Sequence, residues 1–302
     1  MHLSEDHRAV QDAVRAYVRD RIAPNAAAWD RDCHFPREEL RGLAELGCYG
    51  IAVPAEWDGA GLDYLSVSLI LEEIAAGCGA TSTIISVTNC PVNTIMMAFA
   101  SDAQKERFLK PLARGELLGA FCLTEPHVGS EAGGLRTTAV RDGDAYVLNG
   151  VKQFITSGKN GDLAIVMAVT DKAAGKKGIS AFLVPTNTPG YVVARVEEKM
   201  GQHASDTAQI LFENCRIPAA NLIGEEGQGR RSRCRAWKAG ASASRRSRWA
   251  WRARRSRPRW RTPRSASRSA CPSSSTRRSS SSWPTWPPRS RPRASSSITP
   301  PA

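Results

Sequence analysis

The composition of the chain changes abruptly after Gly229, and this change limits which residues can fold. The last 73 of its 302 residues contain 21 Lys and Arg, no Asp or Glu, and no Leu, Val, Phe, Met or Tyr. Such a segment cannot bury enough apolar surface to offset the entropy cost of ordering its backbone. We therefore predict a folded body over residues 1–229 and a disordered segment over residues 230–302. All 29 Asp and Glu lie in the body, so the net charge of +13 comes from the C-terminal segment.

Cysteine spacing and hydropathy argue against several classes of protein. The eight cysteines form no CxxC pair and have no ligand-like spacing to the five histidines, so neither a disulfide framework nor a metal site is predicted. No basic start is followed by an apolar stretch and a cleavage site. The most apolar window, residues 81–99, is interrupted by Asn89, Pro91 and Asn93. These features predict a buried helix in a cytoplasmic protein.

Residues 1–118 have the periodicity of helices. Ser4, ahead of two acidic residues, is a typical N-cap, and apolar side chains then recur at helical spacing as far as Pro24. Ser101 and Gln104 have the capping-box spacing that begins a last helix. The helices expected between these two cover residues 36–47, 65–77 and 81–99, with a Gly-rich loop at 55–64. We predict an N-terminal helical domain.

From Gly119 onward the pattern changes to alternating or short apolar runs bounded by Gly, Asp, Asn and Pro. These runs are AFCLTE, LRTTAV, DAYVLNG, LAIVMAV, ISAFLV, GYVVARVEE and AQILFE, each typical of a strand. Asp142-Gly143 is a strong hairpin signal between two of them. No GxGxxG or Walker motif is present, so a Rossmann or P-loop nucleotide site is not indicated. The predicted fold class is α+β, with helices over residues 1–118 followed by an antiparallel β domain over residues 119–229.

Three segments resemble the acyl-CoA dehydrogenase family: FCLTEPHVGSEAGG (121–134), VKQFITSG (151–158) and KMGQHASDTAQILFENCRIPAANLIGEEGQG (199–229). Three motifs in the right order are more specific than any one of them. The resemblance covers essentially residues 1–229. It implies a helical domain, a central β domain and a C-terminal four-helix domain, with FAD held between the last two and across a subunit interface. It also implies an acyl-CoA substrate, electron-transfer flavoprotein as electron acceptor, and a homo-oligomer.

The first motif is a strand that runs into a Pro/Gly turn. Its backbone groups and the Thr124 hydroxyl can hydrogen-bond the polar edge of a flavin, although the pattern alone favours an ordinary strand end. By resemblance, Phe121, Leu123 and Thr124 contact the flavin, and Ser130 contacts the pantetheine arm of the thioester. Val128 stands where the family usually has a small residue.

The second motif supplies the remaining predicted cofactor contacts. By resemblance, Phe154 is the aromatic residue that packs on the flavin, and Thr156 reaches the flavin N5 region. An aromatic ring beside a flavin excludes water from the reacting atoms. A lone Phe in a strand more often belongs to the core, and the neighbouring Ile155 and Thr156 shift the interpretation to a cofactor site formed by all three residues.

The sequence after Gly229 does not resemble the C-terminal domain of the family. Its Arg, Ser, Trp and Pro content is typical of GC-rich DNA read in a wrong frame. Codons can be chosen for residues 237–244 that encode Leu-Glu-Gly-Gly-Arg-Ile-Gly-Ile when read one nucleotide earlier, and residues 283–290 give Leu-Ala-Asp-Met-Ala-Thr-Glu-Ile in the same way. We interpret residues 230–302 as the product of a frameshift that replaces the C-terminal domain.

The catalytic base of the family is a glutamate of the C-terminal domain, and no carboxylate follows Glu226 in this sequence. We therefore expect this chain to lack the catalytic base. Loss of a general base lowers the reaction rate by roughly 10²- to 10⁴-fold, so we expect little activity. One alternative is a flavin monooxygenase or a nitroalkane-oxidase-like enzyme of the same fold. Another is a noncatalytic protein that binds polyanions nonspecifically through its basic segment. No specific nucleic acid or membrane partner is predicted.

Overall fold

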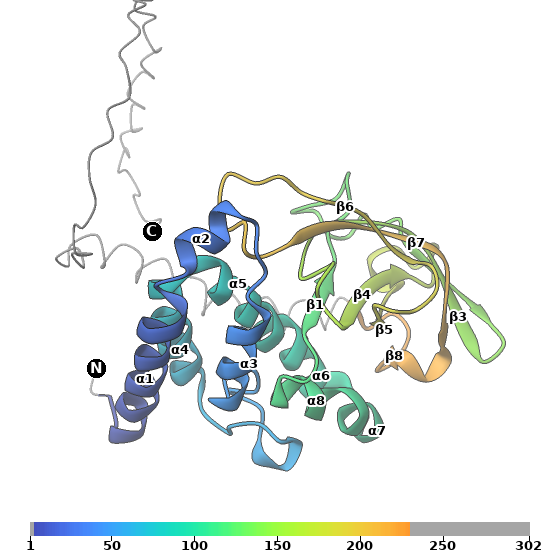
Figure 1. The fold of residues 1–302 in the computed structure, drawn as a ribbon. Coiled ribbons are helices and arrows are strands. Elements are labelled where there is room, and N and C mark those ends of the chain that lie inside the picture. Colours follow the sequence, from blue (N-terminus) through green and yellow to red (C-terminus); the bar gives the residue numbers. More distant parts are fainter. Residues whose placement is uncertain (1–2, 230–302) are drawn as a thin grey trace, which may run out of the picture. The chain divides into compact units, whose positions relative to one another are not determined.

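The computed structural model describes residues 3–229 of the chain (Figure 1). Helices come first and strands follow, in the order that the sequence predicts. The predicted disorder and shifted reading frame of residues 230–302 lie outside the described residues. No helix within residues 3–229 combines the length and hydropathy needed to span a bilayer, and the predicted cytoplasmic location remains a prediction.

The helical part consists of α-helices interrupted by short π and 3₁₀ turns. These elements are α1 (Glu5–Tyr17), η1 (Val18–Ile22), α2 (Ala26–Arg31), α3 (Arg37–Glu45), η2 (Ala55–Trp57), α4 (Tyr64–Gly77), α5 (Gly79–Val87), η3 (Thr88–Asn93), α6 (Thr94–Phe99), α7 (Asp102–Gln104), η4 (Lys105–Leu109) and α8 (Lys110–Arg114). Both predicted caps are confirmed, because the Ser4 and Ser101 hydroxyls accept hydrogen bonds from the third backbone N–H of their helices. Pro91 lies in the π turn η3, where a missing N–H and the proline ring disturb α-helical bonding.

The β part is one sheet that contains all seven predicted runs. Its strands are β1 (Gly119–Cys122), β2 (Thr138–Asp142), β3 (Ala145–Thr156), β4 (Leu163–Val169), β5 (Ile179–Pro185), β6 (Tyr191–Val196), β7 (Thr207–Pro218) and β8 (Leu222–Ile223). The order is β6-β7-β3-β2-β4-β5-β8, with β1 beside β4. The predicted hairpin at Asp142-Gly143 is confirmed, since Asp142 pairs with Ala145 and Gly143 adopts a φ of 61°.

The prediction of a purely antiparallel sheet needs one correction. Strands β1 and β2 both pair with β4 in parallel, whereas the pairs β2–β3, β3–β7, β4–β5, β5–β8 and β6–β7 are antiparallel. A parallel pair requires a long connection between its strands, and here β1 and β4 are separated by the turn of the first motif and the β2–β3 hairpin. Alternation of apolar residues does not reveal such a distant pairing.

Three apolar clusters stabilise the described residues. One lies among α1, α3, α4 and α5 and includes Leu43 and Ile74. The second joins the helices to the sheet, because Leu109 and Leu112 share it with Ile165. The third lies on the other side of β4 and β5 and is shared with β3 and β7. Strands β4 and β5 are therefore buried on both faces, which explains their nearly continuous apolar sequences.

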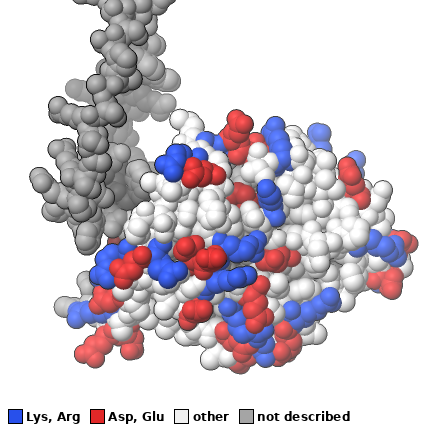
Figure 2. All heavy atoms as spheres, viewed as in Figure 1, with Lys and Arg blue, Asp and Glu red and all other residues white. Residues whose placement is uncertain are grey.

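The surface of the described residues carries charges of both signs. On the face drawn in Figure 2, basic and acidic side chains intermingle without a continuous patch of either sign. Residues 1–229 contain 21 Lys and Arg against 29 Asp and Glu. A polyanion-binding activity would therefore rest on residues 230–302, outside the described part of the chain.

Candidate functional site

The three sequence motifs meet where β1 and β3 end and β7 begins. The Gln153 backbone N–H donates to the Thr124 carbonyl at 2.8 Å, which joins the first motif to the second. Thr156 pairs with Thr207, which joins the second motif to the third. Residues far apart in the sequence thus form one continuous region of backbone, as expected for a shared binding site.

A β-bulge in β3 sets the direction of Phe154. Lys152 pairs with Ile210 and Ile155 with Ala208, so two residues of β3 oppose a single residue of β7. Phe154 has a φ of 58° and its side chain is 61% exposed. A bulky residue in this left-handed conformation costs about 1–3 kcal/mol, and such outliers cluster at functional sites. The alternative interpretation of Phe154 as a core residue is therefore wrong.

The residues that follow Phe154 have different surroundings. Ile155 is 2% exposed and lies in the third apolar cluster, so only its backbone is available to a ligand. Thr156 is half-buried beside it. Ser157 also has a positive φ, and its hydroxyl is buried. The backbone thus leaves its regular strand path at the positions that the second motif assigns to the cofactor.

The predicted contact residues of the first motif differ in how far they are buried. Phe121 and Leu123 are partly buried against the second cluster, Thr124 is half-buried, and Ser130 is exposed. Val128 lies in the same cluster, and its backbone exchanges hydrogen bonds of 3.0 Å with Glu125. The larger side chain at this unusual position therefore points inward and anchors the turn that presents Ser130.

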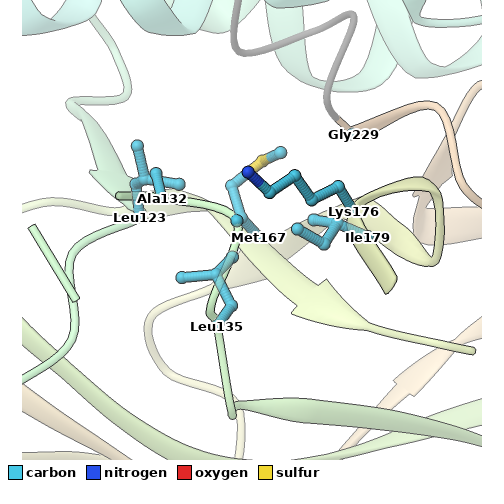
Figure 3. Close-up of a pocket in the computed structure, with 8 residues that line it drawn as sticks. Leu123, Ala132, Leu135, Met167, Lys176, Ile179 and Gly229 are labelled. Carbon is cyan, nitrogen blue, oxygen red and sulfur yellow. The ribbon is translucent and has the colours of Figure 1, made fainter. Parts of the chain in front are cut away.

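A small hollow of about 10 Å³ adjoins the first motif. Figure 3 shows Leu123 and Ala132 on one side, Lys176 and Ile179 on the other, and Met167 between them. Gly229 lines the same hollow, so the described part of the chain ends beside the candidate site. A larger hollow of about 250 Å³ lies among the helices, and none of the predicted site residues lines it.

The structure also reveals a buried ion pair that the sequence did not predict. Lys152 Nζ lies 2.9 Å from Glu125 Oε1, and both side chains are almost completely buried. Burial lowers the pKa of Lys152. Burial alone would raise the pKa of Glu125, but the Lys152 ammonium and backbone N–H donors outweigh it and hold that pKa below its usual range. The Glu125 carboxylate is therefore charged near neutral pH, and it opposes the effect of burial on the pKa of Lys152.

Comparison with known proteins identifies the family. Residues 4–116 match the family model "Acyl-CoA dehydrogenase, N-terminal domain", and residues 120–215 match "Acyl-CoA dehydrogenase, middle domain". This chain belongs to the acyl-CoA dehydrogenase family. The family resemblance and the helix-then-strand fold are thereby confirmed.

Individual relatives cover the same part of the chain. The short-chain specific acyl-CoA dehydrogenase of Rattus norvegicus is 42% identical over 229 residues, which are 76% of this chain and 56% of the relative. The butyryl-CoA dehydrogenase structure from Megasphaera elsdenii is 33% identical, with a TM-score of 0.81 over 83% of this chain and 66% of that chain. A glutaryl-CoA dehydrogenase from Mycobacterium smegmatis, solved in complex with FADH2, is 33% identical, with a TM-score of 0.71 over 82% and 61%. The chain thus matches little more than half the length of its rat relative.

Proposed function

We propose that the described part of this chain is the FAD- and substrate-binding portion of an acyl-CoA dehydrogenase that catalyses α,β-dehydrogenation of an acyl-CoA thioester. The observation that carries this proposal is the exposed, strained Phe154 beside Thr156 and Thr124 at the junction of three family motifs. An exposed aromatic ring on a strained backbone is a feature expected where a ligand covers the ring.

The residues present fit a flavin. Phe154 offers a ring for stacking, while the Thr124 and Thr156 hydroxyls can hydrogen-bond the polar edge of the isoalloxazine. Phe121 and Leu123 supply apolar surface, and the backbone of Ile155 fixes the spacing of its neighbours. The relative solved with FADH2 supports FAD as the cofactor.

Each group then has a defined part in the reaction. Bound FAD would accept the substrate's β-hydrogen as hydride, which carries both electrons of the oxidation. The chain's own residues orient the cofactor and exclude water, with Phe154 as the principal shield. Ser130 is exposed on the turn of the first motif, and its hydroxyl would donate a hydrogen bond to the pantetheine arm. The short-chain and butyryl-CoA relatives favour a short acyl chain.

Removal of the substrate α-proton requires a base. We do not assign this base to any of residues 1–229. In the family this base is a glutamate of the C-terminal domain, whose place the carboxylate-free segment 230–302 occupies here. We propose a frameshift as the cause and a severe loss of activity as the consequence. For the enzyme with its reading frame restored, we propose electron-transfer flavoprotein as the electron acceptor. We also propose that this enzyme is a homo-oligomer.

The proposal is tested with two purified proteins, the chain as it stands and a chain translated in the restored frame after Gly229. We expect the restored protein to be yellow and to reduce an electron-accepting dye with short acyl-CoA, whereas the chain as it stands does so at least 100-fold more slowly. Equal rates would disprove the predicted loss. A restored protein without flavin would disprove the family activity, and oxygen consumption without acyl-CoA would indicate a monooxygenase instead.

A further inference from the structure

The buried ion pair connects two backbone segments of the candidate site. Lys152 Nζ, which lies 2.9 Å from the Glu125 carboxylate, also donates to the Leu123 carbonyl at 3.1 Å. The Glu125 carboxylate in turn accepts hydrogen bonds from the backbone N–H groups of Arg136 and Thr137 at 2.7 and 3.0 Å. The pair therefore reaches both ends of the turn that connects β1 to β2.

Stability alone does not explain this arrangement. A buried ion pair loses so much hydration that apolar residues of similar volume often stabilise a fold equally well. Strands β4 and β5 of the same sheet use apolar residues at almost all of their buried positions. A pair kept at this position should therefore supply something that apolar side chains cannot, namely hydrogen bonds to particular backbone groups.

The groups that the pair holds are those nearest the predicted cofactor contacts. The Leu123 carbonyl immediately precedes Thr124, and Lys152 immediately precedes the bulge that carries Phe154. The Gln153 N–H donates to the Thr124 carbonyl between them. Only a long side chain with several donors can reach the carboxylate and the carbonyl together, and lysine carries three donors.

We propose that Lys152 and Glu125 are positioning residues that fix the first-motif turn against the β3 bulge, so that Thr124 and Phe154 are presented together to the flavin. The proposal rests on the proposed function, because it assigns a role in the same site. It also makes a claim about the protein without ligand. The ion pair orders the turn of residues 123–137, whereas the order of the sheet does not depend on the pair.

The test is a double replacement, Lys152→Met with Glu125→Gln, in the full chain. It removes both charges without leaving either one buried alone, and Gln keeps an acceptor oxygen for the backbone N–H groups. Amide hydrogen exchange then reports each segment separately. We expect amides of residues 123–137 and of Gln153 to exchange at least 10-fold faster, while those of β4 and β5 keep their protection.

Two results would overturn the proposal. Unchanged exchange in residues 123–137 would show that the pair does not order the turn, and an equal loss of protection in β4 and β5 would show a general structural role. The control is Lys110→Met with Glu106→Gln, which removes an ion pair of 2.9 Å in the helical part, where Lys110 is half-buried and Glu106 is exposed. It should leave exchange of residues 123–137 as in the wild type.

Binding of FAD, followed by its fluorescence, provides a separate measurement. We expect the FAD affinity of the double variant to be at least 10-fold lower than that of the unmodified chain. The control variant should bind FAD as tightly as the unmodified chain. Equal affinity of all three would overturn the positioning role. If the unmodified chain binds no FAD, the same three proteins are compared in the restored frame after Gly229, and hydrogen exchange still decides the role of the pair.

Discussion

Strands β4 and β5 and the adjoining ends of β1 and β3 belong to one sheet but are built differently. The first pair runs in unbroken register from Leu163 opposite Pro185 to Val169 opposite Ile179, with nearly every side chain apolar and buried. At the ends of β1 and β3 there are a bulge, two residues with positive φ, an exposed aromatic ring and a buried ion pair.

The difference separates stability from function within the sheet. Regular strands that are buried on both faces gain apolar burial without strain. The irregular ends place an aromatic side chain in solvent and charges in the interior, both of which cost free energy. Such costs are tolerated where a binding site requires them, so relief of the backbone strain at Phe154 should stabilise the protein, whereas truncation of a buried side chain in β4 or β5 should destabilise it.

The largest effect should come from the regular region. Phe182→Ala in β5 removes a ring that is 0% exposed and lies 4.9 Å, between centroids, from the Tyr146 ring. We expect the free energy of unfolding to fall by about 3–5 kcal/mol because a cavity is left in the third cluster. Urea denaturation measures the change, and Val140→Ala, at a site 62% exposed, is the control that should shift it by less than about 0.5 kcal/mol.

A pH-dependent effect should follow from Glu125. Its pKa is lower in the folded protein than in the unfolded chain, so its stabilising contribution is complete above the ordinary glutamate range and is lost as the pH falls through the folded-state pKa. Glu125→Gln should cost about 3 kcal/mol near neutral pH because Lys152 is left unpaired. Denaturation at a series of pH values should show this difference shrinking below about pH 4, and a constant difference would contradict the assignment.

The irregular region should gain stability where it loses function. Phe154→Gly replaces a bulky residue at a φ of 58° with the residue best suited to that conformation. We expect an increase of about 1 kcal/mol in the free energy of unfolding, together with weaker FAD binding. Cys33→Gly, at a φ of 52° in the helical part, is the matched control, which should stabilise the protein without changing FAD affinity.

The smallest effect on the fold should come from Ser130. Ser130→Ala removes an exposed hydroxyl, so the free energy of unfolding should stay within about 0.5 kcal/mol of the wild type. Loss of one hydrogen bond to pantetheine should weaken acyl-CoA binding by about 1 kcal/mol, roughly fivefold. Titration calorimetry would measure this change, and unchanged affinity would remove Ser130 from the proposed substrate site.

Much of the site was visible in the sequence because its motifs are local. Phe121, Leu123, Thr124 and Thr156 lie in short segments whose order predicts a common site, and the structure brings these segments together. The pairing of Lys152 with Glu125 could not be predicted in this way. A charged residue in a strand, such as Lys152, ordinarily indicates a solvent-facing position. Their partnership spans 27 residues of sequence and becomes evident only in three dimensions.

The sequence by itself determined the succession of helices and strands within residues 3–229, and the family. These properties depend on composition, on the periods of helix and strand, and on short motifs, all of which act between near neighbours. The tertiary structure decided the parallel pairing of β1 and β2 with β4, the outward direction of Phe154 and the burial of Lys152 with Glu125. Register, bulges and desolvation depend on partners distant in the chain, so the arrangement of those partners had to be known first.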